Sequence, residues 1–289
     1  MKKLKILMFV KNESRYIEMT VRSLLAQTFT DFDLIISDNH STDDTALIAS
    51  SISKEDQRVK VVSPPVPCDM HEHVKYVRQF ATAPYVLHVA GHDIYDAHFV
   101  ERCINVLDSD AGVDVATSDF YHFNSDNKVF KIPNLGFSSK GFSKLTKLTT
   151  YLQGTSYDCV NYGVFRTSKI LGITTPHVLG CDHLVVAKLL MQGDVHFINE
   201  PLVYFRYPEN SQDQKRQVSS LGTVDGAKGW RDLMVAVLEI VHENFQGHER
   251  RYAKMMVKSI YMTHYLYMAG QLGISVEQAA YIADEVFGE

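Results

Sequence analysis

The sequence predicts an α/β fold in which a mostly parallel sheet carries flanking helices and is followed by a helical C-terminal region. Two observations predict this class. Short apolar segments alternate with amphipathic ones as far as about residue 120, and such alternation is typical of a parallel sheet covered on both faces. From Trp230 onward, apolar residues recur at helical spacing, as in Leu233, Val237 and Val241.

The first half of the chain supplies most of the predicted sheet. Apolar runs predict five strands, at Lys5–Val10, Asp33–Ser37, Arg58–Val62, Tyr85–Val89 and Val113–Thr117. Helices are predicted between them, at Ser14–Gln27, from about Asp43, before Tyr85 and at Ala97–Leu107. Ligands of such sheets gather at the carboxyl ends of the strands. The turns that follow the strands are therefore the first place to look for a functional site.

After about residue 120 the pattern loosens. Four short strands are predicted, at Lys128–Ile132, Val160–Phe165, His196–Ile198 and Leu202–Phe205, with a helix at Asp182–Met191. Gly136–Lys147 is rich in Gly, Ser and Lys and is predicted to be a loop. Pro208–Gly229 is polar and is predicted to be a mobile loop.

Composition limits the class of protein. The 289 residues are 45% hydrophobic and 22% charged, which is ordinary for a soluble globular protein. The net charge of −5 argues against nucleic acid as a partner. Four dispersed cysteines form no CxxC pair, which favours a reducing compartment. No apolar run approaches the roughly 20 residues that span a bilayer, so we expect a cytoplasmic protein, at most peripheral to the inner face of the membrane.

The segment LIISDNHSTDDT, from Leu34 to Thr45, joins an apolar strand to a polar turn. Ser41 and Asp43 are explained as turn and helix-capping residues. Asp38 stands where the apolar run meets the turn, and a carboxylate there can accept hydrogen bonds from a base edge or a ribose hydroxyl. Spacing alone leaves a ligand role and a purely structural role open for Asp38.

The stretch Leu4–Thr45 resembles the opening of the inverting glycosyltransferase family 2. It has the family's order of a strand, a KNE turn, a helix ending in SLLAQTF, and a strand ending in SDNHSTD. The resemblance implies the GT-A fold, a Rossmann-like sheet. It also implies that the donor nucleotide is held by Val10, Asn12, Glu13 and Asp38.

A second part of the resemblance concerns a divalent metal. Relatives carry a D-x-D motif after the fourth strand, and YVLHVAGHDIYDAHF aligns Gly91, His92 and Asp93 with it, so that the first carboxylate is missing. The resemblance implies that Asp93 binds Mn²⁺ or Mg²⁺, a hard cation that prefers oxygen ligands, and that His92 lines the cofactor site. Alternatively, Asp93 and Asp96 cap the helix that follows.

The third part lies in the second half of the chain. Gly180–Arg206 resembles the family's helix with an acidic first turn, followed by a segment ending in P-L-x-x-Y-R. The resemblance implies that Asp182 is the base that deprotonates the acceptor hydroxyl. The alternative is that Asp182 is a helix N-cap. Arg206 is either a phosphate-side cation or a surface residue.

Arg78 falls where relatives carry an arginine close to the diphosphate or the base, and a solvated position on a helix face is the alternative. Two groups of soft ligands, Cys68 with His71 and His73, and His177 with Cys181 and His183, lack the paired spacing of a zinc site. No G-x-S-x-G elbow and no Walker or G-x-G-x-x-G motif is present.

We therefore expect an enzyme that moves a single sugar from a nucleotide diphosphate sugar, UDP-linked as in many relatives, to an acceptor hydroxyl with inversion. The family context suggests a glycan or lipid-linked glycan acceptor in bacterial cell-surface polysaccharide biosynthesis. The expected organisation is a GT-A domain over residues 1–225, with a nucleotide-binding half at 1–120 and an acceptor half at 121–225, and a C-terminal helical extension at 226–289.

Two alternatives stay open, and the extension adds two expectations. The missing carboxylate allows an inactive module that binds a sugar nucleotide or a glycan. A nucleotidyltransferase is disfavoured because the first turn, FVKNESR, lacks glycines. The C-terminal helices could form a homodimer, and Tyr261, Tyr265 and Tyr267 with nearby lysines could touch a membrane surface.

Overall fold

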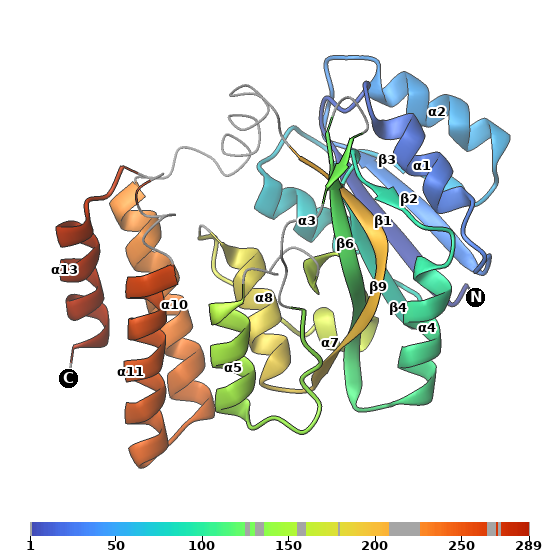
Figure 1. The fold of residues 1–289 in the computed structure, drawn as a ribbon. Coiled ribbons are helices and arrows are strands. Elements are labelled where there is room, and N and C mark those ends of the chain that lie inside the picture. Colours follow the sequence, from blue (N-terminus) through green and yellow to red (C-terminus); the bar gives the residue numbers. More distant parts are fainter. Residues whose placement is uncertain are drawn as a thin grey trace.

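The structure is a computed structural model that describes residues 2–124, 128–130, 136–154, 160–178, 180–207, 226–264, 270 and 273–288. One mixed sheet forms the centre of the molecule, and helices cover both of its faces (Figure 1). Helices α5, α8, α10, α11 and α13 lie together on one side of the sheet, and the C-terminal α13 is the outermost (Figure 1).

Strands and helices alternate through the first half of the chain, and helices dominate the last quarter. The strands are β1 Leu4–Val10, β2 Phe32–Asp38, β3 Val59–Val62, β4 Tyr85–Val89, β5 Ile94–Tyr95, β6 Val113–Phe123, β7 Val129–Phe130, β8 Val164–Arg166 and β9 Asp194–Arg206. The helices are α1 Ile17–Leu25, α2 Thr45–Glu55, α3 Met70–Arg78, α4 Phe99–Ser109, α5 Lys144–Gln153, α7 Thr167–Ile170, α8 Cys181–Leu190, α10 Gly226–Asn244, α11 Gly247–His264 and α13 Val276–Phe287.

The sheet has the order β3-β2-β1-β4-β8-β6-β9-β5, with β7 paired to β6. The first four strands are parallel, as predicted, and β6 and β9 are also parallel. The short β8 lies antiparallel between β4 and β6, and β5 lies antiparallel to β9. The carboxyl ends of β1, β2 and β4 therefore meet at one edge, beside the outer half of β6 and β9.

Burial explains why the apolar runs become strands. In β1, Leu4, Ile6, Leu7 and Met8 are completely buried, and in β2 Leu34 and Ile36 are too. A parallel strand that is covered on both faces requires such continuous apolar character. The predicted strands of the first half all appear, with ends displaced by a few residues at most except in β6, which continues to Phe123.

The strand predicted at Val160–Phe165 appears in part, as β8 Val164–Arg166, while Val160 and Asn161 are helical. Three other predictions for the second half were wrong. Part of the expected loop Gly136–Lys147 belongs to α5, which Ser143 caps by accepting a hydrogen bond from the backbone N–H of Thr146 at 3.1 Å. The two short strands expected near residue 200 form the single bulged strand β9. The expected loop Pro208–Gly229 ends in the first turn of α10, and its residues 208–225 lie outside the described residues.

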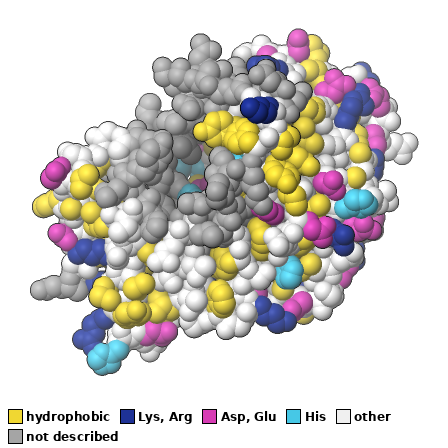
Figure 2. All heavy atoms as spheres, in the orientation of Figure 1, with side chains coloured by type: hydrophobic (Ala, Val, Ile, Leu, Met, Phe, Trp, Pro, Cys, Tyr) yellow, Lys and Arg dark blue, Asp and Glu magenta, His cyan; other side chains and the backbone are white. Residues whose placement is uncertain are grey.

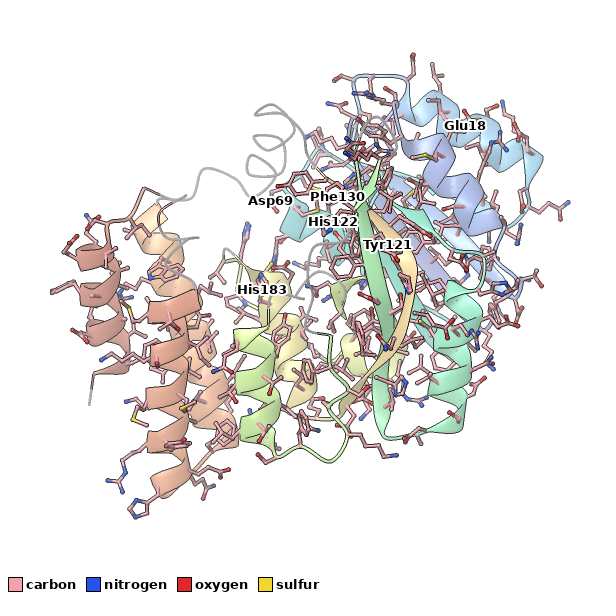
Figure 3. All side chains as sticks on the ribbon, in the orientation of Figure 1. Glu18, Asp69, Tyr121, His122, Phe130 and His183 are labelled. Atoms are coloured by element: carbon pink, nitrogen blue, oxygen red, sulfur yellow. The ribbon has the colours of Figure 1, made fainter. Side chains whose placement is uncertain are left out.

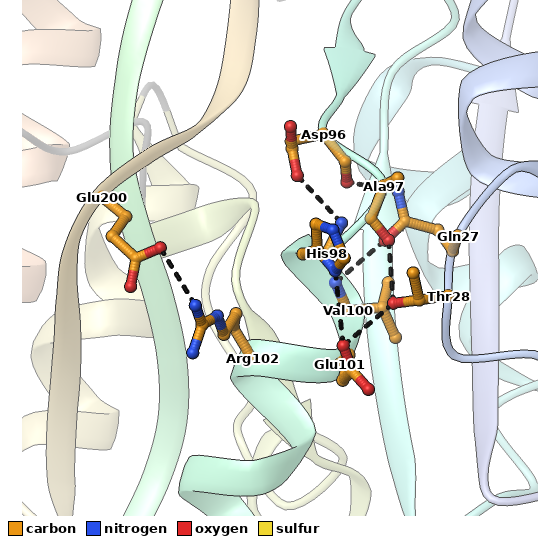
Figure 4. A network of polar contacts seen from close by, with 9 residues as sticks. All are labelled: Gln27, Thr28, Asp96, Ala97, His98, Val100, Glu101, Arg102 and Glu200. Atoms are coloured by element: carbon orange, nitrogen blue, oxygen red, sulfur yellow. Dashed lines mark hydrogen bonds and ion pairs between the residues drawn. The ribbon is translucent and has the colours of Figure 1, made fainter.

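A polar network fixes the helix that follows the candidate metal motif (Figure 4). The side-chain amide of Gln27, in the SLLAQTF segment, donates to the carbonyl of Asp96 at 2.6 Å and accepts from the backbone N–H of Val100 at 3.0 Å. The backbone N–H of Thr28 donates to the carbonyl of Ala97 at 2.8 Å. These bonds connect the end of α1 to the start of α4, so the segment between β4 and α4 has a defined position.

The C-terminal helices α10, α11 and α13 pack on one another around a buried aromatic group. Trp230 and Tyr261 are almost fully buried and meet edge to face at 5.6 Å, and Phe287 lies against Tyr261. The expectation that Tyr261 touches a membrane is therefore wrong; Tyr265 and Tyr267 lie outside the described residues. Among the helices described, none is both long and apolar enough to cross a bilayer.

Candidate active site

The turns after β1 and β2 are joined to each other by hydrogen bonds. Asn12 has a φ of 58°, in the left-handed region that asparagine tolerates better than most residues. Its backbone N–H donates to Ser41 Oγ at 2.8 Å, and its side-chain oxygen accepts from the backbone N–H of Thr42 at 2.8 Å. Asp38 accepts hydrogen bonds from the backbone N–H and the hydroxyl of Ser41. Asn12 and Asp38, both predicted to hold the nucleotide, are thus connected through Ser41.

Asp43 connects the starts of α1 and α2, which supports its predicted structural role. Its carboxylate accepts from the backbone N–H groups of Ser14 at 3.1 Å and Thr45 at 3.0 Å. Burial raises the pKa of Asp43, but the hydrogen bonds from Thr45 and Ser14 outweigh this effect and lower that pKa to about 2. Thr45 in turn accepts from the backbone N–H of Glu13 at 2.7 Å. The backbone of the KNE turn is therefore fixed at successive residues.

Gly91 occupies the position of the missing carboxylate, and the surrounding structure leaves no room for one. A Cβ atom at Gly91 would lie 2.7 Å from Cγ1 of Val10 and 3.0 Å from Cγ of Glu13. Val10 itself is buried, and its carbonyl accepts from the backbone N–H of Asn39 at 2.9 Å. Val10 therefore contributes its packing and its backbone to the site.

His92 is paired with Glu13. Nδ1 of His92 lies 2.9 Å from Oε1 of Glu13. Burial lowers the pKa of His92, but the charge of Asp93 and the hydrogen bond to Glu13 outweigh this and raise that pKa to about 9. The imidazole is therefore protonated at neutral pH. It places a positive charge at the carboxyl end of β4.

Asp93 is only 3% exposed, and burial raises its pKa. Its Oδ1 accepts the backbone N–H of Arg206 at 2.9 Å. The capping alternative is wrong for both Asp93 and Asp96. His98 is the N-cap residue of α4 and no side chain makes the cap hydrogen bond, and the Asp96 carboxylate accepts the backbone N–H of His98 itself at 2.9 Å. Asp93 instead points to β9 through its bond to Arg206.

Arg206 is held at the site by aromatic stacking. Its guanidinium carbon lies 4.0 Å from the ring centroid of Tyr16 and 4.2 Å from that of Phe123. Its Nε donates to the carbonyl of His92 at 3.2 Å. Arg206 is thus a fixed cation next to the aligned D-x-D segment, and the alternative of a free surface arginine does not apply.

The side chains around Asp93 could bind a divalent cation through only one protein carboxylate. Asp93 commits one oxygen to Arg206 and has a second oxygen for a ligand, and His92 already has Glu13 and a positive charge. Within the described residues, no group of three His, Cys, Asp or Glu side chains could hold a metal ion. A cation here would take one carboxylate from the protein and its other oxygen ligands from the diphosphate and water.

Helix α3 lies against the same strand ends. His73 is buried and shares a hydrogen bond of 2.9 Å with the hydroxyl of Ser37, directly before Asp38. Burial lowers the pKa of His73 to about 4, so the ring is neutral. Neither Ser37 nor His73 was predicted to belong to the nucleotide site, because the contact joins residues from different elements.

Arg78 ends α3 and is half-buried, so the alternative of a solvated helix-face arginine is wrong. Its Nε is buried and finds no hydrogen-bond partner among the described residues. Burial lowers its pKa, and its charge acts on His88 of β4 and on Cys181 of α8. Arg78 therefore lies between β4 and α8, the helix that carries Asp182.

Asp182 is exposed in the first turn of α8. The N-cap residue of this helix is Gly180, which has a φ of 71°, and no side chain makes the cap hydrogen bond. The alternative that Asp182 is the N-cap is therefore wrong. At the strand ends, Asn12 is linked to Asp38 through Ser41, and Glu13 bonds to His92. Asp182 makes no such bond and interacts electrostatically with Cys181, which also interacts with Arg78.

The two histidine and cysteine groups do not form a zinc site among the described residues. His71 stacks on His177 at 4.6 Å between ring centroids, and Nε2 of His177 lies 3.8 Å from a carboxylate oxygen of Asp69. The backbone N–H of Cys68 donates to the side chain of Asn39. The contacts of His177 connect the start of α3 with the segment before α8, and the bond of Cys68 connects it with the turn after β2.

Comparison with known proteins agrees with this geometry. The family model described as "Glycosyl transferase family 2" matches residues 5–170. A curated relative from Campylobacter jejuni, GalNAc(5)-diNAcBac-PP-undecaprenol beta-1,3-glucosyltransferase, is 33% identical over 60 residues. That match spans 21% of this chain and 19% of the relative.

Solved structures show the same fold along nearly the whole chain. Residues 1–349 of S. aureus TarS, in complex with UDP-GlcNAc, superpose with a TM-score of 0.73 at 14% identity, covering 99% of this chain and 80% of that one. The mannosyltransferase PcManGT from Pyrobaculum calidifontis, in complex with GDP-Man and Mn²⁺, gives a TM-score of 0.57 at 12% identity, covering 99% of this chain and 74% of that one.

Proposed function

Because this chain belongs to glycosyl transferase family 2, a family of inverting transferases, we propose that it moves a single sugar from a nucleoside diphosphate sugar to an acceptor hydroxyl. The observation that carries the proposal is the set of connected turns at the carboxyl ends of β1, β2 and β4. There, Asn12, Asp38, Glu13, His92 and Asp93 lie in adjoining hydrogen-bonded turns. This is the edge at which open α/β sheets bind ligands.

The donor half of the reaction is assigned to these turns. Asp38 and the backbone of the KNE turn bind the nucleoside, and Arg78 extends the positive charge toward the diphosphate. The protonated His92 and the stacked Arg206 stabilise the negative charge that develops on the leaving diphosphate. Asp93 would hold a divalent cation, which supplies Lewis-acid stabilisation of the same oxygens when it is bound.

The acceptor half is assigned to Asp182. Its carboxylate takes the proton of the acceptor hydroxyl as that oxygen forms a bond to the anomeric carbon. The bond from the anomeric carbon to the diphosphate oxygen breaks on the opposite face, so the configuration is inverted and a nucleoside diphosphate leaves. An exposed position in the first turn of α8 allows Asp182 to meet an acceptor that arrives from solvent.

The finer identity of both substrates rests on the relatives. TarS binds UDP-GlcNAc and PcManGT binds GDP-Man, and we propose a uridine donor because TarS has the higher structural similarity of the two. The name of the Campylobacter relative specifies a polyprenyl-linked glycan. We propose an acceptor of that class, a glycan or a lipid-linked glycan, in the synthesis of a bacterial cell-surface polysaccharide.

Asp182→Asn tests the catalytic assignment. The variant keeps the shape of the side chain and removes its basicity, so turnover should fall by about 10²–10⁴-fold while UDP still raises the thermal stability of the protein. Glu277→Gln is the matched control, because Glu277 is also an exposed carboxylate in the first turn of a helix, α13. Undiminished turnover in Asp182→Asn would show that another group is the base.

One observation favours a second function. The crowded Gly91 removes a carboxylate from the metal motif, as expected in an inactive module that only binds a sugar nucleotide. The same assay separates the two functions. A wild-type protein that is stabilised by UDP-sugars but releases no UDP, with Mn²⁺ and with a panel of acceptor glycans, would be such a module.

A further inference from the structure

Asp38 lies between two residues that are both bonded to the start of α3. On one side, the hydroxyl of Ser37 shares a hydrogen bond of 2.9 Å with Nε2 of His73. On the other side, the side-chain amide of Asn39 donates to the carbonyl of Cys68 at 2.7 Å and accepts from the backbone N–H of that residue at 3.1 Å. The segment that leads into α3, together with the first turn of that helix, therefore holds the backbone of Asp38 from both sides.

The pair of Ser37 and His73 is a polar contact in a place without water. Acidic and basic side chains lie interspersed at the surface over α1 and α2, where water solvates them (Figure 2). Ser37 is 0% exposed and His73 is 2% exposed, so the hydrogen bond between them replaces bonds to water. Burial lowers the pKa of His73 to about 4. The contact is therefore a bond between two neutral groups at neutral pH.

Packing alone does not require a polar pair here. The buried residues of α3 are His73 and the apolar Val77, and the ring of Phe9 meets that of His73 edge on at 6.3 Å. Two apolar side chains of similar shape could fill the space of Ser37 and His73 at little cost in stability. A buried hydrogen bond adds a preferred geometry that apolar contacts lack. The pair therefore fixes where the end of β2 lies relative to α3.

Helix α3 also adjoins the acceptor half of the site. Asp69, the N-cap residue of α3, lies on the side of the sheet that faces α8 and its His183 (Figure 3). Nε2 of His177, which precedes α8, is 3.8 Å from a carboxylate oxygen of Asp69. The same short helix thus contacts both the end of β2 and the segment that leads into α8.

We propose that His73 is a positioning residue for the nucleotide base, a proposal that rests on the proposed binding of the nucleoside by Asp38. Through its bond to Ser37, His73 fixes the end of β2 so that the carboxylate of Asp38 meets a ring N–H of the base. An ionised carboxylate only accepts hydrogen bonds. Uracil and guanine present such an N–H, whereas adenine and cytosine present a bare ring nitrogen and are rejected.

The test compares the binding of UDP with that of 3-methyl-UDP, in which a methyl group replaces the ring N–H, by isothermal titration calorimetry. The wild type should bind UDP at least about tenfold more tightly, because the analogue cannot donate to the carboxylate. His73→Leu removes the bond to Ser37, and the ratio of the two affinities should fall to about twofold. His73→Gln should restore most of the ratio, because its amide can reach the position of Nε2. GDP and 1-methyl-GDP are measured in the same way, which covers a guanosine donor.

The double variant Ser37→Ala with His73→Leu separates position from stability. It replaces both polar partners by apolar groups, so urea unfolding should occur near the wild-type midpoint, while the ratio of affinities stays at about twofold. His88→Leu is the matched control. His88 is also buried and neutral, its pKa being lowered to about 3 by burial, and its ring lies 6.4 Å from that of Phe9. Its Nε2 has no partner among the described residues, so this variant should keep the wild-type ratio.

Three results would overturn the proposal. One is a wild-type ratio in both His73→Leu and the double variant, and another is an equal loss of the ratio in His88→Leu. The third is a wild-type protein that binds each nucleotide and its methylated form equally, because Asp38 would then not contact the base. A wild type that binds none of the four nucleotides would instead count against the proposed function itself.

Discussion

The backbone N–H of Arg206 donates a hydrogen bond to Oδ1 of Asp93 at 2.9 Å, across 113 positions of sequence. The same arginine places its guanidinium between Tyr16 and Phe123 and donates to the carbonyl of His92. The last residue of β9 therefore holds the segment that carries Asp93 against the start of α1. This relationship makes the position of Asp93 depend on the second half of the chain.

Asp93→Asn separates the charge of Asp93 from its structural role. The amide oxygen can still accept the N–H of Arg206, so thermal unfolding should occur at nearly the wild-type temperature. Sugar transfer should fall by about 10²–10³-fold, because the stabilisation of the leaving diphosphate is lost. The measurement is the rate of UDP release at several Mn²⁺ concentrations, with Asp96→Asn as the control that keeps the site intact. Manganese-dependent turnover at the wild-type level in Asp93→Asn would contradict the assignment.

Gly91→Asp restores the missing carboxylate of the motif but should not restore a better metal site. Its Cβ would lie 2.7 Å from Cγ1 of Val10, and overpacking of this kind costs about 1–3 kcal/mol. Denaturant unfolding should show that loss, and Val10→Ala in the same chain should recover part of it. A variant as stable as the wild type that binds Mn²⁺ more tightly would refute this interpretation.

The pair of His92 and Glu13 should make stability depend on pH. The folded-state pKa of His92, about 9, lies above its ordinary value of 6.5. Its contribution to stability is therefore complete below about pH 6.5 and is lost as the pH rises through about 9. The groups that face the ring are Glu13, Asp93 and Arg206. The free energy of unfolding should decrease by a few kcal/mol over this interval, and His92→Gln should remove most of the decrease.

Chemical denaturation at closely spaced pH values from about 6 to about 10 provides the measurement for both proteins. Lysine and tyrosine titration contributes equally to the two curves, so the difference between them reports His92. Parallel curves would mean that the imidazole is not held in its charged form by Glu13 and Asp93.

Asn12 has two separable contributions to the turn after β1. Asn12→Ala loses the hydrogen bond to Thr42 and places a residue with a Cβ but no local hydrogen bond at a φ of 58°. The expected cost is about 2 kcal/mol. Asn12→Gly should cost less because glycine accepts this conformation, and Asn12→Asp should cost least because it retains the acceptor oxygen. Equal stability of the alanine and glycine variants, measured by urea unfolding, would show that the backbone conformation is not strained.

The sequence by itself determined the strands and helices of the first half, because the alternation of apolar and polar residues is local. It also indicated Asn12, Asp38 and Asp43 through a turn motif that lies within a few residues of a strand end. The two-residue β5 and the helix α5 had no comparable local pattern. β5 is too short to show periodicity, and α5 begins in a stretch whose Gly, Ser and Lys content indicates a loop. The strand at β8 was predicted, but its antiparallel direction was not.

Only the tertiary structure decided which charges lie together. The stacking of Arg206 between Tyr16 and Phe123, the bond of that residue to Asp93, and the pairing of His92 with Glu13 all join distant segments. Their strength depends on burial and on distances of a few ångströms, which residue spacing does not report. The motifs identified Asp93 and Asp182 separately. The neighbours of each residue depend on how β9 and α8 pack against the parallel strands.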